Sequence, residues 1–187
     1  MTVLGLPSAL QHAAQTRDDG KPSLTVEELL SIAVPTAPEL AYACDQGWID
    51  IAQAIAVVKA KRLSRAGMAE SETRLEAGSV TLAQFIVEAA TERTPLVARE
   101  TYWLYVFMAW GWRVRHQVRR PSELVEAIYV TLNKPFQLEG FAWMARSWGP
   151  KVGFLRSRRR AQLKAWRAYL DSDFGYFSDR AVIQGAR

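Results

Sequence analysis

The chain has 187 residues, of which 49% are hydrophobic and 23% are charged. This composition excludes a disordered, collagen-like or coiled-coil protein, and the length is close to the ~150 residues of an average domain. The formal net charge is +5, but residues 1–100 contain 9 Lys and Arg against 13 Asp and Glu, whereas residues 101–187 contain 15 against 6. The resulting charges of −4 and +9 are compatible with an anionic partner, an acidic partner protein, or two regions that attract each other.

Three features of the sequence bear on its compartment. Cys44 is the only cysteine, so no disulfide can form within the chain, which is typical of the reducing cytoplasm. The N-terminal residues have no Lys or Arg before Arg17 and no long apolar run, so they do not resemble a signal peptide. The most apolar stretch, 102–112, has 11 residues, fewer than the ~20 that a transmembrane helix needs. We therefore expect an unexported, cytoplasmic protein that does not insert into a membrane.

The chain is predicted to consist of a loosely ordered segment at 1–22 and a single helical domain at 23–187. The segment ends in a polar run that contains Gly20 and Pro22, which both interrupt regular structure. The domain begins with Thr25 and Glu28, whose spacing is that of a capping box, in which each side chain accepts a hydrogen bond from the other residue's backbone N–H. The first helix follows from Thr25 and is predicted to end at 34–38.

Two helices are predicted next, at 38–45 and about 48–66, and together they would form an αα-hairpin. Gly47 lies between them and is the usual residue for a left-handed helix stop. One face of the second helix carries side chains at helical spacing, namely Ile51, Ile55, Val58 and Arg62.

The second half of the chain contains several helix starts. Thr81 precedes an apolar series of Leu82, Phe85, Ile86 and Ala89, and Thr94 with Pro95 forms an N-cap followed by proline. Pro121 opens a helix to about 132, Pro135 opens another, and the last helix is predicted at about 155–170. No strand pattern is convincing, so we predict an all-α bundle of about six to eight helices, built from αα-hairpins.

Aromatic side chains are dense between 102 and 112, and at about 100° per residue they cannot share one face of a helix. We expect this helix to be apolar nearly all round and central in the core; the alternative is that an aromatic face emerges as a binding anchor. Trp143 and Trp148 are candidate partner-binding residues, because tryptophan is enriched among interface hot spots.

No group of residues in the sequence indicates catalysis. His12 and His116 have no evident carboxylate or nucleophile as a partner, and Cys44 is expected to be a buried, inert thiol. Helix caps and solvated helix faces explain the paired carboxylates, which are Glu27 with Glu28 and Asp171 with Asp173. We therefore predict that the protein is not an enzyme and needs no metal or cofactor.

Residues 151–167 contain seven basic side chains and no acidic one. Those that fall largely on one side of the last predicted helix are Arg156, Arg159, Arg160, Lys164 and Arg167. Such a side could bind phosphates, so a nucleic-acid-binding helical module is the alternative function, although no recognised nucleic-acid motif accompanies it. The apolar residues of this helix are expected to pack on the domain, and they are Leu155, Leu163, Trp166 and Leu170.

The segment 121–135, with the sequence PSELVEAIYVTLNKP, continues to Phe141–Met144 and Gly149–Pro150 and resembles the bacterial family 2247 of domains of unknown function. In that family a helix ending in an Ile-Tyr pair leads to a proline-started element, and an earlier Gly-Trp pair opens a helix, as Gly47–Trp48 does here. The likeness covers about residues 38–170. Asn133–Pro135 and Trp143–Pro150 replace the family's shorter Tyr-Pro and Tyr-Met-Pro turns.

Members of that family look like immunity proteins encoded beside polymorphic or contact-dependent toxins. The resemblance implies a cytoplasmic protein that binds a cognate toxin domain and neutralises it by occlusion, without catalysis. Either the acidic half contacts a basic toxin, or the basic half contacts an acidic one. The residues that we expect at the partner interface are Trp143, Trp148, Arg156, Arg159 and Arg160.

Overall fold

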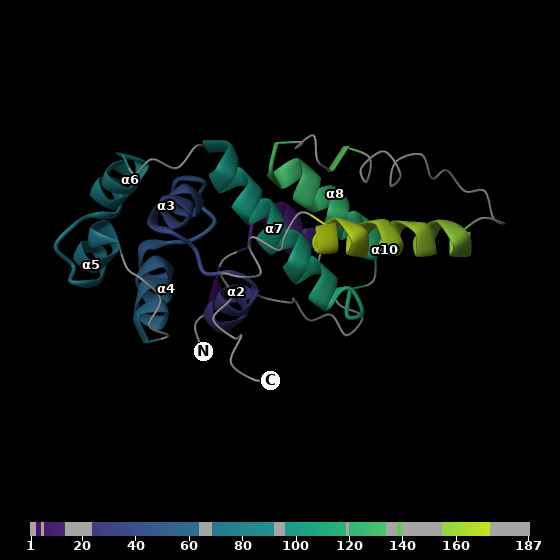
Figure 1. Ribbon diagram of the computed structural model, residues 1–187, viewed down its shortest axis with the longest axis horizontal. Coiled ribbons are helices and arrows are strands. Elements are labelled where there is room, and N and C mark those ends of the chain that lie inside the picture. Colours follow the sequence, from purple (N-terminus) through teal and green to yellow (C-terminus); the bar gives the residue numbers. More distant parts are fainter. Residues whose placement is uncertain are drawn as a thin grey trace. The chain divides into compact units, whose positions relative to one another are not determined.

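Helices dominate the structure of the chain (Figure 1). The computed structural model describes residues 3–4, 6–13, 24–63, 69–91, 96–118, 120–133, 138–139 and 155–172. Nine helices and one two-stranded sheet lie in these ranges, which confirms the predicted all-α class. No helix in these ranges combines the length and the apolar character needed to cross a membrane.

The described residues form two compact units, and each unit combines segments from different parts of the chain. Unit 1 comprises residues 3–4, 6–7, 24–63, 69–91 and 96–106. Unit 2 comprises residues 8–13, 107–118, 120–133, 138–139 and 155–172. The range 23–187, which was predicted to be one domain, thus contributes to both units, and each unit is described by itself.

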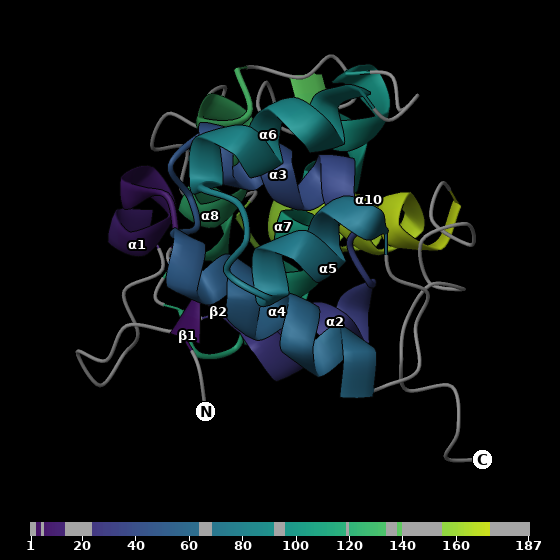
Figure 2. The same cartoon turned by 90° about the vertical axis from the view of Figure 1, so that its left-hand side faces the viewer.

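Unit 1 contains a short sheet and most of the helices. Its strands are β1 (Val3–Leu4) and β2 (Leu24–Thr25), which pair antiparallel with Val3 opposite Thr25. Its helices are α2 (Val26–Ile32), α3 (Ala37–Asp45), α4 (Ile51–Leu63), α5 (Glu70–Glu76), α6 (Leu82–Thr91) and the first part of α7 (Leu96–Val114). In Figure 2, α6 lies against α3, while α4 contacts α2 and α5.

Part of the segment 1–22 that was predicted to be loosely ordered is folded. Residues 3–4 form β1 in unit 1, and α1 (Ser8–Ala13) packs on α8 (Pro121–Thr131) in unit 2. Leu4, Leu6 and Leu10 are buried. The prediction was wrong for these residues, because it was based on the polar run at 14–22 and overlooked the leucines before it, which are buried in the fold. The polar run itself lies outside the described residues.

Reciprocal side-chain caps set the starts of several helices in unit 1. The predicted capping box of α2 is confirmed, since Thr25 N–H donates to the Glu28 carboxylate at 2.9 Å and Glu28 N–H donates to Thr25 Oγ1 at 3.1 Å. Asp50 and Gln53 exchange two such bonds of 2.8 Å ahead of α4. The helix was predicted to begin at about Trp48. Because of this cap it begins at Ile51 instead.

The buried side of α4 is not the face that was singled out in the sequence. Of that face, only Val58 is buried, whereas Ile51 is 39% exposed and Arg62 lies in solvent. The buried side consists of Ala54, Val57, Val58 and Lys61. Lys61 is buried on this side because its ammonium group pairs with the carboxylate of Glu72.

Lys61 and Glu72 form a buried ion pair between α4 and α5. Lys61 Nζ lies 2.9 Å from both Glu72 carboxylate oxygens and 3.3 Å from the carbonyl oxygen of Pro35. Glu72 also accepts a 3.0 Å hydrogen bond from the backbone N–H of Ala69, just before α5. All three ammonium protons thus have acceptors, which offsets the cost of removing both charges from water.

The aromatic helix α7 is buried as predicted, and residues 102–108 are all buried. In unit 1, the Tyr102 hydroxyl donates to the carbonyl oxygen of Ala33 at 2.8 Å, and Trp103 Nε1 donates to that of Glu39 at 2.7 Å. The Trp103 ring also meets the Trp48 ring edge to face, with centroids 5.8 Å apart. These contacts fix α7 against α3 and the segment before it.

Unit 2 consists of α1, α8, α10 (Leu155–Ser172) and α7 from Phe107 onward. Pro121 begins α8 as predicted, and its apolar residues Leu124 and Ile128 are fully buried. α10 covers the predicted range 155–170 and ends at Ser172. Most of the helix predicted to open at Pro135 lies outside the described residues, apart from residues 138–139.

The buried ion pair generates a stability prediction. Lys61→Met leaves the Glu72 carboxylate buried without its cation, so we expect a loss of about 3–5 kcal/mol in the free energy of unfolding. The neighbouring change Arg62→Met breaks an exposed pair with Glu76 and should cost less than about 1 kcal/mol. Urea unfolding measures both, and equal losses in the two variants would contradict the prediction.

Candidate functional site

The two units differ in the sign of their net charge. Among the described residues, unit 1 carries 5 Lys and Arg against 10 Asp and Glu, a net charge of −5. Unit 2 carries 9 against 4, a net charge of +5. The asymmetry predicted from the two halves of the sequence is therefore a property of two folded units. The strongest concentration of positive charge lies on α10.

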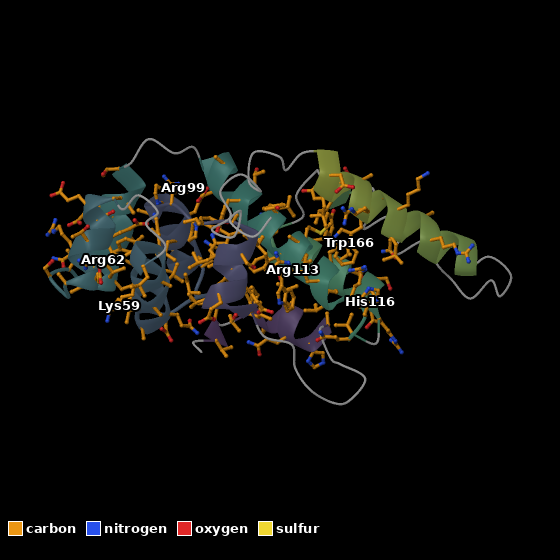
Figure 3. The ribbon with its side chains drawn as sticks, turned by 60° about the horizontal axis from the view of Figure 1, so that its bottom comes forward. Lys59, Arg62, Arg99, Arg113, His116 and Trp166 are labelled. Atoms are coloured by element: carbon orange, nitrogen blue, oxygen red, sulfur yellow. The ribbon has the colours of Figure 1, made fainter. Side chains whose placement is uncertain are left out.

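One side of α10 is anchored by a tryptophan. Trp166 is 1% exposed, and its Nε1 donates to the carbonyl oxygen of Met108 in α7 at 3.1 Å. Figure 3 shows Trp166 where α10 meets α7. A Cβ atom at Gly111 would lie 3.1 Å from the Trp166 ring, so glycine permits this close approach. Trp166 was expected to pack on the domain, and its burial confirms this.

The opposite side of α10 is exposed and basic. Arg160, Lys164 and Arg167 follow one another at spacings of four and three residues, which places them on one side of the helix, and all three are exposed. We call these three residues the cationic face. Arg167 Nε contacts Asp171 Oδ2 at 2.9 Å, and both of these side chains are more than half exposed.

The Arg115 guanidinium interacts electrostatically with Arg167. The Arg115 guanidinium stands over the Trp112 ring at 3.8 Å and donates to the Trp112 carbonyl oxygen. The Trp112 ring in turn meets the Trp166 ring, with centroids 5.6 Å apart. Burial, and then the positive charge of Arg167, lower the pKa of Arg115. A chain of contacts thus joins Arg115 to Trp166, the residue that precedes Arg167 in α10.

The predicted interface residues have different outcomes. Arg160 is exposed on α10, as expected for a partner-binding residue. Arg156 and Arg159 also belong to α10, but their side chains lie outside the described residues, as do Trp143 and Trp148 altogether.

Trp112 and Arg115 were not identified from the sequence as parts of a site. Trp112 was assigned to the core helix, and Arg115 was counted only as charge. The local signal was their spacing of three residues, at which a helix brings two side chains together and an arginine can stack on an indole. That α10 lies beside this pair could not be inferred from spacing.

The groups considered for chemistry belong to different segments of the chain. Cys44 is buried in α3, and burial, followed by the charge of Asp50, raises the pKa of its thiol to about 12. His12 and His116 are exposed in unit 2. Within the part of the chain that the structure describes, no group of three or more His, Cys, Asp or Glu side chains could hold a metal ion.

The anchoring of α10 can be tested at Trp166. Trp166→Ala removes a fully buried indole and its hydrogen bond, so we expect a loss of about 3–5 kcal/mol in the free energy of unfolding. Lys164→Ala, two residues away on the exposed side, should change it by less than about 0.5 kcal/mol. Urea unfolding provides the measurement, and a small effect of Trp166→Ala would contradict the anchored arrangement.

The raised pKa of Cys44 predicts its reactivity. Below a pH of about 12 the folded protein keeps the thiol protonated, so a disulfide reagent at pH 9 should react slowly. The same reagent should react fast in urea, where the thiol is exposed and ionises near its ordinary pKa. By linkage, this thiol favours the folded state below its ordinary pKa, and that contribution declines as the pH rises toward 12. Equal reaction rates in buffer and in urea would contradict the prediction.

Neither the protein-family models, nor the curated proteins, nor the solved structures contain a match to this chain. The features that bear on function are therefore the cationic face and the sequence resemblance of residues 121–150.

Proposed function

We propose that this protein is a cytoplasmic immunity protein that binds a cognate toxin domain and neutralises it by occlusion, without catalysis. The sequence resemblance at 121–150 suggests this class. The observation that carries the proposal is the cationic face of α10, which presents Arg160, Lys164 and Arg167 to solvent from a helix held by Trp166. An exposed, firmly supported charged surface is suited to stoichiometric binding.

The arrangement favours fast and specific association with an acidic toxin surface. Oppositely charged surfaces steer the encounter and can raise association rates to about 10⁸ M⁻¹s⁻¹ or more at low salt. The helix backbone is already fixed by the Trp166 anchor, so only the exposed side chains lose freedom on binding. A blocking protein needs this surface and no reacting groups.

Nucleic-acid binding is the second candidate, because the same face could also contact phosphates. Two properties distinguish it from protein binding. Affinity for DNA or RNA would not depend on sequence, and it would fall steeply with salt concentration. Retardation of DNA or RNA at low salt, together with no effect on a toxin, would favour this candidate.

The proposal predicts that a toxin domain is encoded next to this gene, and co-expression with that domain tests it. The wild-type protein should permit growth, and the triple change Arg160→Glu, Lys164→Glu and Arg167→Glu should abolish protection, because it replaces attraction by repulsion. The matched control is Lys59→Glu with Arg62→Glu on α4, two exposed positions in unit 1 (Figure 3). Growth arrest despite soluble wild-type protein would overturn the proposal.

A further inference from the structure

Several described cations of unit 2 have no carboxylate partner. Arg160 and Lys164 form no ion pair within the described residues, and Arg115 uses one N–H for the Trp112 carbonyl oxygen. Other described cations do pair with carboxylates, as in Arg62 with Glu76, Arg74 with Glu88 and Arg120 with Glu123. Arg115, Arg160 and Lys164 are thus three positive charges of unit 2 that no described carboxylate neutralises.

The position of Arg115 is fixed by its surroundings. Its guanidinium stacks on the Trp112 ring, so an aromatic surface covers one side of the group. The Trp112 ring in turn contacts the buried Trp166 ring. A guanidinium has five N–H donors in its plane, and stacking leaves its edge able to donate. The positive charge of Arg167 acts on Arg115, and within the described residues no carboxylate is paired with Arg115. An external anion would offset this repulsion.

Arg167 already binds a carboxylate, which indicates the kind of anion that can bind beside Arg115. Its Nε contacts the Asp171 carboxylate at 2.9 Å, and both side chains are largely exposed. An exposed pair of this kind, four residues apart on one helix, is weak. A carboxylate from a partner can therefore take the place of Asp171.

We propose that the Trp112-stacked Arg115 and Arg167 form a recognition point for a carboxylate side chain of an acidic partner protein, with Arg160 and Lys164 contacting further acidic side chains. This inference rests on the proposed function and assigns the chemistry of the partner surface. Arginine matches a carboxylate with two parallel hydrogen bonds, which lysine cannot form.

The ion pair of Arg167 favours an acidic protein over a nucleic acid. Its guanidinium already holds a carboxylate, that of Asp171. A carboxylate side chain of a partner can exchange with this group one for one and with the same hydrogen-bond geometry.

The test measures binding of the full chain to a labelled peptide of alternating Glu and Ser, by fluorescence anisotropy. Arg115→Lys keeps the net charge but loses the planar donor pair, so we expect the affinity to fall at least about fivefold. Asp171→Asn removes the competing carboxylate and should raise the affinity about twofold or more. Lys59→Arg, an exposed cation in unit 1, is the matched control and should leave the affinity within about twofold.

Near-ultraviolet circular dichroism checks that Arg115→Lys keeps the wild-type packing, and Arg167→Lys provides a second variant away from the Trp112 ring. Unchanged affinity in both lysine variants would overturn the inference. So would duplex DNA that binds more tightly than the peptide and responds to both variants in the same way.

The inference and the proposed function can fail separately. If the peptide results hold but the neighbouring toxin still arrests growth, the carboxylate site stands and the toxin assignment is wrong. If the toxin is neutralised equally well by wild type, Arg115→Lys and Arg167→Lys, the function stands and the carboxylate site is wrong.

Discussion

A buried aromatic side chain with a polar atom must place that atom on an acceptor, and both units depend on this constraint. In unit 1, α7 places the Tyr102 hydroxyl and the Trp103 indole on carbonyl oxygens of Ala33 and Glu39. In unit 2, the carbonyl oxygen of Met108 in the same helix accepts from Trp166 of α10. Because residues 101–112 carry no charge, α7 can be covered by apolar contacts on several sides. The helix therefore organises the packing around it in each unit.

Buried and exposed charges are stabilised in different ways. Unit 1 buries Lys61 against Glu72, since an ion removed from water needs a close counter-charge and acceptors for all its protons. Unit 2 keeps Arg160 and Lys164 in water, where hydration stabilises them, and within the described residues no carboxylate pairs with them. Arg115 is intermediate, because the Trp112 ring covers part of its guanidinium. Positive charge on α10 and at the end of α7 therefore stays accessible.

The candidate site was only partly predictable. The sequence located the basic helix and the exposed residue Arg160 correctly, because charge density and helical spacing are local properties. It did not locate Trp112 and Arg115, because their stacking and the contact with Trp166 depend on how α7 and α10 pack. A helix anchored on one side and charged on the other supports a binding role, and stacking of Arg115 adds geometric selectivity to the charge.

The sequence by itself determined the helical class, the capping box of Thr25, the aromatic helix and the bounds of α10, because each depends on residues a few positions apart. It did not determine which side of α4 is buried, since Lys61 becomes an interior residue only where Glu72 of another helix meets it. Likewise, only the tertiary structure places the Trp112 ring beside Trp166 and so brings Arg115 to the helix that carries the cationic face. Ion pairing and ring stacking depend on distances in space between residues far apart in the chain, and spacing along the sequence does not contain those distances.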